Sequence, residues 1–74
     1  MKTHESEEMY LETILLLKQK RSAVRSIDVA EELGYAKSSV SRAVNLLLKK
    51  GFIAIDGAGD ITLTAEGRAK ATGI

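Results

Sequence analysis

The sequence predicts an α+β winged helix-turn-helix with a three-helix core, a two-stranded β-hairpin wing and a short C-terminal helix. Two observations carry this prediction. Apolar residues recur at the helical period as far as Gly51, and beyond it they alternate with period 2. Two of the helical segments are separated only by a short turn that contains Gly34, as in a helix-turn-helix. The 74 residues fit one domain, with the helix-turn-helix at about 26–50 and the wing at about 52–64.

The first helical segment is expected from about Ser6 to Lys20. Tyr10, Ile14 and Leu17 lie at helical spacing and form a broad apolar face, which Met9, Leu11, Leu15 and Leu16 flank. Ser6 is the expected N-cap. Acidic residues lie at its start and basic residues at its end, which complements the helix dipole at both termini.

The next two helices are expected at 27–33 and at about 37–50. Before them, residues 22–25 are interpreted as a connector or a one-bridge strand, and Ser26 is the expected cap of the second helix. Gly34 should end that helix in the left-handed conformation.

Small and branched residues at fixed positions let these two helices pack together. Ala30 admits close approach of the following helix, and Val40 should fill the wedge between the two. Gly51 should stop the third helix.

The C-terminal third is expected to form a hairpin and a short helix. The strands are predicted at 52–56 and 61–64, and the glycines of the loop between them should supply positive φ. Thr64 can cap a last helix at about 65–71. The expected core comprises the inward-facing apolar residues Tyr10, Ile14, Leu17, Val29, Ala30, Leu33, Val40, Ala43, Val44, Leu47, Ile53, Ile55, Ile61 and Leu63.

The composition excludes several classes of protein. Because the chain has no Cys, it has neither disulfides nor Cys-based metal knuckles. No apolar run approaches the ~18 residues of a membrane span and no signal peptide opens the chain, so we expect a cytoplasmic protein without a membrane partner. The sequence has no His within a catalytic motif, no phosphate-binding Gly loop and no paired carboxylates in a plausible cleft. We therefore expect no enzyme and no small-molecule substrate.

The net charge of +1 conceals a basic middle section. Residues 18–25 contain four bases and no acid, and residues 33–55 contain four more bases and again no acid. This distribution suits a nucleic-acid-binding protein, although solvated helix ends would give the same charges.

The third helix presents a polar face that suits DNA. At 100° per residue, Ser38, Ser41, Arg42, Asn45 and Lys49 gather opposite the core side, and every one of them can donate a hydrogen bond to a base edge or a phosphate. An ordinary surface helix is the alternative, but such helices usually mix Glu with Lys. We therefore predict binding of double-stranded DNA through this face.

Three blocks of the sequence resemble the DNA-binding domain of the iron-dependent repressors, also called the diphtheria toxin repressor family. They are EMYLETI at 8–14, VRSIDVAEELGY at 24–35 and KSSVSRAV at 37–44. The stretch ITLTAEGR at 61–68 is similar to that family's segment leaving the wing. The resemblance implies a metal-responsive transcriptional repressor that binds operators as dimers.

Carried over by position, the resemblance implies phosphate contacts from four serines, base-edge contacts from Arg42 and backbone contacts from Lys49. Serines at the start of the third helix also lie where backbone N–H groups attract anions. The candidate DNA contacts are Ser26, Lys37, Ser38, Ser39, Ser41, Arg42, Asn45 and Lys49, with Gly57 and Gly59 on the wing.

The sequence departs from the family in three places. Ala36 stands where the family commonly has a Ser able to cap the recognition helix. The wing tip carries Asp56 and Asp60 and no base; it could offer backbone N–H groups to phosphate, but its acids should repel DNA. The family's chains continue into a dimerisation and metal-binding domain from the position of Ile74 onward.

Metal binding is implied by the resemblance alone. Met9 and Glu12 match the first-helix positions from which the family draws metal ligands, a soft sulfur donor and a hard oxygen donor. Helix packing and a solvated acid are the alternative interpretation, which we favour for this chain, and His4 is its only His. We expect no cofactor for this chain alone, whereas Fe(II) or Mn(II) is implied if a second domain exists.

The sequence thus favours a transcriptional regulator that binds double-stranded DNA sequence-selectively. The alternative is a winged-helix protein–protein interaction module without DNA binding, for which Leu46 and Leu48 could provide a surface. Because one winged helix covers one half-site, the chain is expected to be a monomer or a weak homodimer.

Overall fold

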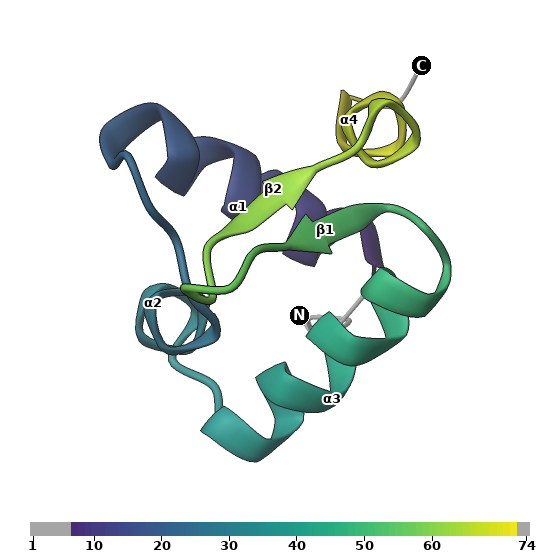
Figure 1. Cartoon of the computed structure of the whole chain (residues 1–74). Coiled ribbons are helices and arrows are strands. Elements are labelled where there is room, and N and C mark those ends of the chain that lie inside the picture. The colour runs from purple at the N-terminus through teal and green to yellow at the C-terminus, as the bar shows by residue number, and fades with distance from the viewer. Residues whose placement is uncertain (1–6, 73–74) are drawn as a thin grey trace.

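The computed structural model describes residues 7–72 and, within them, contains four helices and one two-stranded antiparallel sheet (Figure 1). The arrangement is the winged helix that the sequence predicts. No helix in the described part of the chain is both long and apolar enough to cross a membrane. In chain order the elements are α1 (Glu7–Lys20), α2 (Ser26–Leu33), α3 (Lys37–Lys49), β1 (Ile53–Ile55), β2 (Ile61–Leu63) and α4 (Ala65–Thr72).

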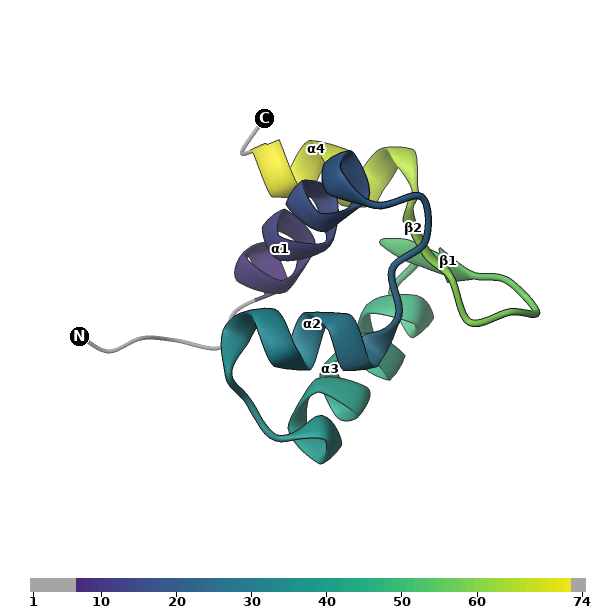
Figure 2. The same cartoon turned by 90° about the vertical axis from the view of Figure 1, so that its left-hand side faces the viewer.

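Helix α1 runs through the middle of the molecule, between α4 on one side and α2 on the other (Figure 2). Because it is covered from more than one direction, its core residues include Leu11, which flanks the predicted apolar face but lies outside the predicted core. Leu11 is fully buried, and Thr13 is buried with its hydroxyl donating to the Met9 carbonyl at 2.9 Å. The predicted N-cap, Ser6, lies outside the described residues.

Helices α2 and α3 form the predicted helix-turn-helix. Gly34 adopts φ 72°, in the left-handed region, and its N–H donates to the Ala30 carbonyl at 2.8 Å. Ala30 and Val40 are both buried where the two helices pack together. The small residue, the glycine and the wedge side chain therefore occupy the positions that their spacing predicts.

The start of α2 corrects one prediction. Ser26 is the first residue of the helix and Arg25 is its N-cap residue. The Arg25 N–H donates to the Asp28 carboxylate at 2.9 Å, and this carboxylate also pairs with Arg21 at 2.7 Å. The Arg25 carbonyl accepts the N–H groups of Asp28 and Val29, so the helix begins one residue before the position at which Ser26 could cap it.

The hairpin is shorter than predicted and is joined to the α1–α2 connector. The register pairs Ile53 with Leu63 and Ile55 with Ile61, which places Ile53, Ile61 and Leu63 against the core. The Ile61 N–H donates to the carbonyl of Val24 at 2.7 Å, so the connector contributes one hydrogen bond to the edge of the sheet.

The buried core agrees with the predicted one except at its margins. Leu33, Ala43 and Ile55 are only partly buried, because they lie toward the ends or sides of their elements. Three residues outside the predicted core replace them: Leu11, Val24 and Ala71. Val24 is buried because its carbonyl is hydrogen-bonded to the edge of the sheet, and Ala71 is buried because α4 packs on α1.

Thr64 caps α4, as predicted, and also ties it to the end of α3. Its hydroxyl accepts the Gly67 N–H at 3.1 Å and donates to the Gly51 carbonyl at 2.7 Å. The Thr64 N–H donates to the Phe52 carbonyl at 3.0 Å. These bonds bring the first turn of α4 against the Phe52 backbone.

Candidate nucleic-acid interface

Helix α3 separates an apolar side from a polar one. It directs Val40, Val44 and Leu47 into the core. The opposite side is exposed and holds the five residues that we call the polar face of α3: Ser38, Ser41, Arg42, Asn45 and Lys49. The separation has a physical cause, because the burial of three apolar residues at helical spacing fixes the rotation of the helix about its axis.

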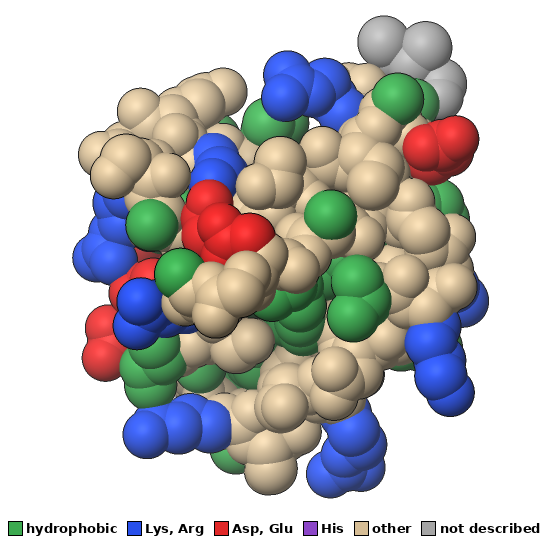
Figure 3. Space-filling view, viewed as in Figure 1, with side chains coloured by type: hydrophobic (Ala, Val, Ile, Leu, Met, Phe, Trp, Pro, Cys, Tyr) green, Lys and Arg blue, Asp and Glu red, His purple; other side chains and the backbone are tan. Residues whose placement is uncertain are grey.

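The bases of α3 are not neutralised by acids in the part of the chain that the structure describes. Among residues 7–72, the side chains of Lys37, Arg42 and Lys49 take part in no ion pair, whereas Lys18 is paired with Asp60. Lys and Arg side chains project along the lower part of the surface, where α3 lies, and no described acid covers that helix in this view (Figure 3). The polar face of α3 is thus a positively charged surface available to an anionic partner.

The N-terminus of α3 adds to this positive surface. Its N-cap residue is Ala36, whose methyl group cannot accept the N–H groups of the first turn. Lys37 and Ser38, in that turn, are both exposed. Uncapped N–H groups together with the helix dipole attract an anion such as a phosphate.

Two of the predicted serines lie apart from the polar face of α3. Ser39 is partly buried and lines an open groove with Tyr10 of α1 and with Arg42, Ala43 and Leu46. Ser26 is partly buried at the first position of α2. Both positions are at the margin of the surface that α3 presents.

The wing loop is held by its own first acid. The Asp56 carboxylate accepts the N–H groups of Ala58 and Asp60, each at 2.9 Å, and the Asp56 carbonyl accepts that of Gly59 at 3.0 Å. Gly59 has φ +88°, whereas Gly57 does not adopt positive φ. Among the described residues, the Gly57 N–H has no hydrogen-bond acceptor, so of the two candidate glycines only Gly57 offers its N–H to a phosphate.

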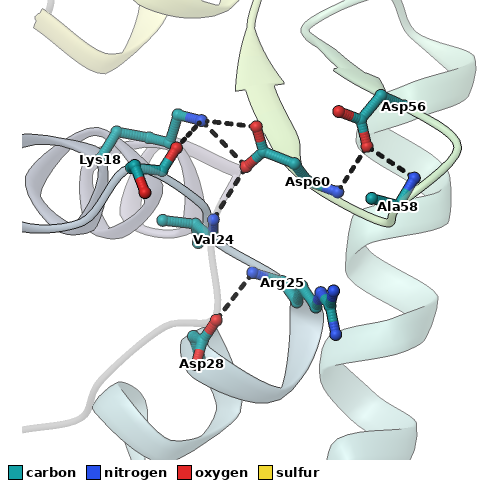
Figure 4. Close-up of polar contacts among 8 residues, drawn as sticks. Lys18, Val24, Arg25, Asp28, Asp56, Ala58 and Asp60 are labelled. Atoms are coloured by element: carbon teal, nitrogen blue, oxygen red, sulfur yellow. Dashed lines mark hydrogen bonds and ion pairs between the residues drawn. The ribbon is translucent and has the colours of Figure 1, made fainter.

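The second acid of the wing anchors it to the rest of the domain (Figure 4). Both carboxylate oxygens of Asp60 accept from the Lys18 ammonium, at 2.9 and 3.0 Å, and one also accepts the Val24 N–H at 2.8 Å. The Val24 N–H and then Lys18 hold the pKa of the Asp60 carboxyl below its ordinary value. The repulsion of DNA predicted for the wing therefore rests on Asp56 alone.

Replacing Asp60 with Asn is expected to lower the thermal midpoint at neutral pH, because the charge that Lys18 and Val24 stabilise is removed. A carboxyl with a lowered folded-state pKa contributes stability above its ordinary value of 3.8 and loses it as the pH falls through the folded value. The difference in thermal midpoint between the wild type and Asp60→Asn should therefore become smaller as the pH falls below 3.8. Circular dichroism melts across the acidic range test this, and Glu31→Gln, which neutralises an exposed acid of α2, is the control. A constant difference would contradict it.

Sequence reasoning missed the partners around the wing. Lys18 and Asp60 lie 42 residues apart, and no local pattern links them. It also missed Arg25, whose Cγ, Cδ and Nε atoms lie 3.8–3.9 Å from the point where a Gly59 side chain would begin. The only sequence feature that indicated partners for the wing was the lack of a base in the wing loop itself.

The residues carried over as metal ligands form an incomplete set. Met9 is partly buried, and its sulfur accepts a hydrogen bond from the Tyr35 hydroxyl at 3.7 Å, while Glu12 is exposed on the same helix. Within residues 7–72, no group of three or more His, Cys, Asp or Glu side chains could hold a metal ion. His4 lies outside the described residues. Two donors do not make the closed ligand set that Fe(II) or Mn(II) requires.

Comparison with known proteins gives one family and one fold. The sequence model of the iron dependent repressor N-terminal DNA binding domain matches residues 2–59. The chain is similar in structure to the M. tuberculosis transcriptional regulator MosR, with a TM-score of 0.68 and 20% sequence identity. That similarity covers 85% of this chain and 48% of the regulator's chain, so this chain spans about half of the regulator's length. No curated protein matches it.

Proposed function

The chain belongs to the iron-dependent repressor family and carries its DNA-binding domain, and from this premise we propose that it binds double-stranded DNA sequence-selectively as a transcriptional regulator. We propose further that it is the DNA-binding part of a metal-dependent repressor and has no catalytic role. The observation that carries the proposal is the polar face of α3, which is exposed, free of acids and supplied with bases unpaired in the described part of the chain.

In this proposal α3 enters the major groove, whose base edges present a distinct pattern for each base pair. Arg42 lies near the middle of the polar face and reads base edges through its guanidinium, supported by Ser41 and Asn45. The contacts that position the domain on the backbone come from its margins. They are Ser26, Lys37, Ser38, Ser39 and Lys49, with the Gly57 N–H on the wing.

The proposal is tested by fluorescence anisotropy with two labelled duplexes, one of random sequence and one selected from a random pool by the protein itself. Binding should weaken steeply from low to moderate salt, because phosphate contacts release counterions. The selected duplex should bind more tightly than the random one. Salt-insensitive binding, or equal affinity for the two duplexes, would contradict the proposed selectivity.

Lys49→Ala is expected to weaken binding to selected and random duplexes by the same factor. Lys49 is exposed at the last turn of α3, where a Lys contacts backbone phosphates and not base edges. Removing one such contact should lower the slope of log affinity against log salt by about one. The same anisotropy series measures the slope. A loss confined to the selected duplex would show that Lys49 reads bases instead.

We propose that the isolated chain forms at most a weak homodimer. One winged helix covers one half-site, and a pair of half-sites requires a second copy in symmetric register. The titration that measures DNA affinity also gives the stoichiometry per half-site.

Calorimetric titration of the chain with Mn(II) or Fe(II) is expected to detect only weak binding. Met9 and Glu12 supply at most two ligands. The binding free energy from two donors on one helix does not offset the free energy needed to dehydrate the ion. DNA binding should therefore be unchanged by a chelator. Micromolar metal affinity, or DNA binding lost on adding chelator, would contradict this and would imply a site assembled between chains.

One observation favours the alternative function, a protein-interaction module. Leu46 and Leu48 are 47% and 42% exposed on α3, and Leu46 lines the open groove beside Tyr10. If this surface binds a protein in place of DNA, binding of random-sequence DNA at low salt should be absent.

A further inference from the structure

We propose that Arg25 supplies the positive charge that the wing loop lacks, and that its guanidinium binds a backbone phosphate of DNA beside the wing. The inference rests on the proposed DNA binding and assigns a contact outside α3. It is carried by where the Arg25 side chain lies, by the absence of an ion pair to its guanidinium within residues 7–72 and by the chemistry of the neighbouring wing loop.

The backbone of Arg25 is fixed from both sides. Its N–H donates to the Asp28 carboxylate at 2.9 Å, and its carbonyl accepts the N–H groups of Asp28 and Val29 at 3.0 and 3.2 Å. The preceding residue, Val24, is bonded through its N–H to Asp60 and through its carbonyl to Ile61. The base of the side chain therefore sits in a fixed position between α2 and the hairpin, which limits the conformational entropy lost on binding.

The side chain of Arg25 lies beside the wing loop. Its stem and Nε lie 3.8–3.9 Å from the position of a Cβ at Gly59, which is van der Waals distance. It extends away from the pair formed by Lys18 and Asp60 (Figure 4). Within residues 7–72 the guanidinium takes part in no ion pair or side-chain hydrogen bond, and the residue is exposed.

The other arginine near this connector, by contrast, is paired within the described part of the chain. Arg21 precedes the same connector, and its guanidinium is bound to the Asp28 carboxylate at 2.7 Å. Asp28 thus neutralises Arg21, while it contacts Arg25 only through the backbone N–H. Of these two arginines, only Arg25 retains a guanidinium available for an outside anion.

The wing loop needs a cation from elsewhere if it is to approach DNA. Residues 56–60 contain two acids and no base, and the N–H groups of Ala58, Gly59 and Asp60 are donated within the loop. Lys18 compensates Asp60, but Asp56 keeps its charge. Arg25 lies beside this loop at Gly59 and brings a positive charge there, which also helps to lower the pKa of the Asp60 carboxyl.

The helix-turn-helix geometry places Arg25 at the DNA backbone. When the second helix of the motif lies in the major groove, the first helix crosses the backbone. Arg25 directly precedes the first of these helices, α2, and contacts the wing loop, so it faces the strand that separates the major groove from the groove beside the wing. A guanidinium there meets a phosphate oxygen, which it binds bidentately whatever the base sequence.

The test compares Arg25→Ala, Arg25→Lys and the matched control Arg21→Ala in anisotropy titrations over a series of salt concentrations. Arg25→Ala should weaken binding to selected and random duplexes alike, by about tenfold at low salt, and should lower the salt slope by about one. Arg25→Lys should restore the slope, since it restores the charge, and Arg21→Ala should leave the slope unchanged. Circular dichroism melts check that each variant is folded, as expected because the cap of α2 uses only the Arg25 backbone.

A duplex series with single neutral methylphosphonates then locates the contact. Replacing one particular phosphate should weaken DNA binding by the wild-type protein. Replacing the same phosphate should leave DNA binding by Arg25→Ala unchanged. If Arg25→Ala behaves like Arg21→Ala while Arg42→Ala still weakens binding, the Arg25 inference is wrong and the proposed function stands. A loss confined to duplexes with A·T flanks would overturn the phosphate assignment in favour of minor-groove base readout. If the wild type shows no salt-sensitive binding, the proposed function fails and the inference fails with it.

Discussion

Replacing Gly67 with Ala is expected to lower the free energy of unfolding by about 3 kcal/mol, the upper part of the range for overpacked sites. A Cβ at position 67 would lie 1.9 Å from the Phe52 carbonyl oxygen, and this neighbour is backbone, which cannot rotate away. Relief requires α4 to move from the start of β1, which breaks the bonds of Thr64 to Gly51 and Phe52. In a domain of this size such a loss removes most of the stability.

Urea unfolding followed by circular dichroism measures the effect, with Gly57→Ala as the matched control. A Cβ at Gly57 would meet nothing within 4 Å, and this residue does not adopt positive φ. Gly57→Ala should therefore leave the midpoint unchanged within error. A Gly67→Ala variant as stable as that control would show that α4 shifts freely and that its contact with β1 contributes little.

Replacing Arg42 with Ala is expected to cost ~1–3 kcal/mol in binding to the selected duplex, about one to two orders of magnitude in affinity, and to relax specificity. Arg42 is exposed, and it makes no ion pair with the described residues, so its removal leaves the fold intact. Binding to random duplexes should fall much less, because there the lost contact carries no sequence information.

Arg68→Ala is the matched control for this variant, since it removes the same charge from an exposed position on α4. Helix α4 lies at the opposite end of the molecule from α3 in both views (Figures 1 and 2). Arg68→Ala should bind both duplexes like the wild type. Equal losses for Arg42→Ala and Arg68→Ala would show that net charge alone governs binding and that Arg42 reads no base.

The fold could be predicted from the sequence because its strongest signals are local. The positive φ at Gly34, the buried wedge at Val40 and the cap at Thr64 follow from residue type and spacing within one turn or helix. The rotation of α3 follows from three apolar positions, so the polar face of α3 was predictable too.

The predictions failed where contacts from distant parts of the chain decide the outcome. Ser26 has the chemistry of a cap, but the helix begins one residue earlier, with Arg25 as its N-cap residue. Leu11 flanks the predicted apolar face but was left out of the predicted core, and it is fully buried because α1 is covered on more than one side. No local pattern indicated that the wing acid Asp60 pairs with Lys18, which lies 42 residues away in the sequence.

The candidate site was accordingly predictable on α3 and not around the wing. A helix face is determined by residues three and four apart, whereas the wing contacts join segments far apart in the sequence. Gly67 illustrates the same limit, because a glycine inside a helix carries no sign of the backbone that approaches it. Only the tertiary structure places Phe52 there.

The most direct test of DNA binding through α3 is a two-dimensional NMR titration of the full chain with the selected duplex at low and at moderate salt. The predicted result is a set of salt-sensitive shifts that cluster on residues 36–49, strongest at the polar face of α3, with a smaller set at Arg25 and Gly57. Residues of α4 should not shift. Binding without salt sensitivity, or the absence of shifts at 36–49, would contradict DNA recognition by this helix.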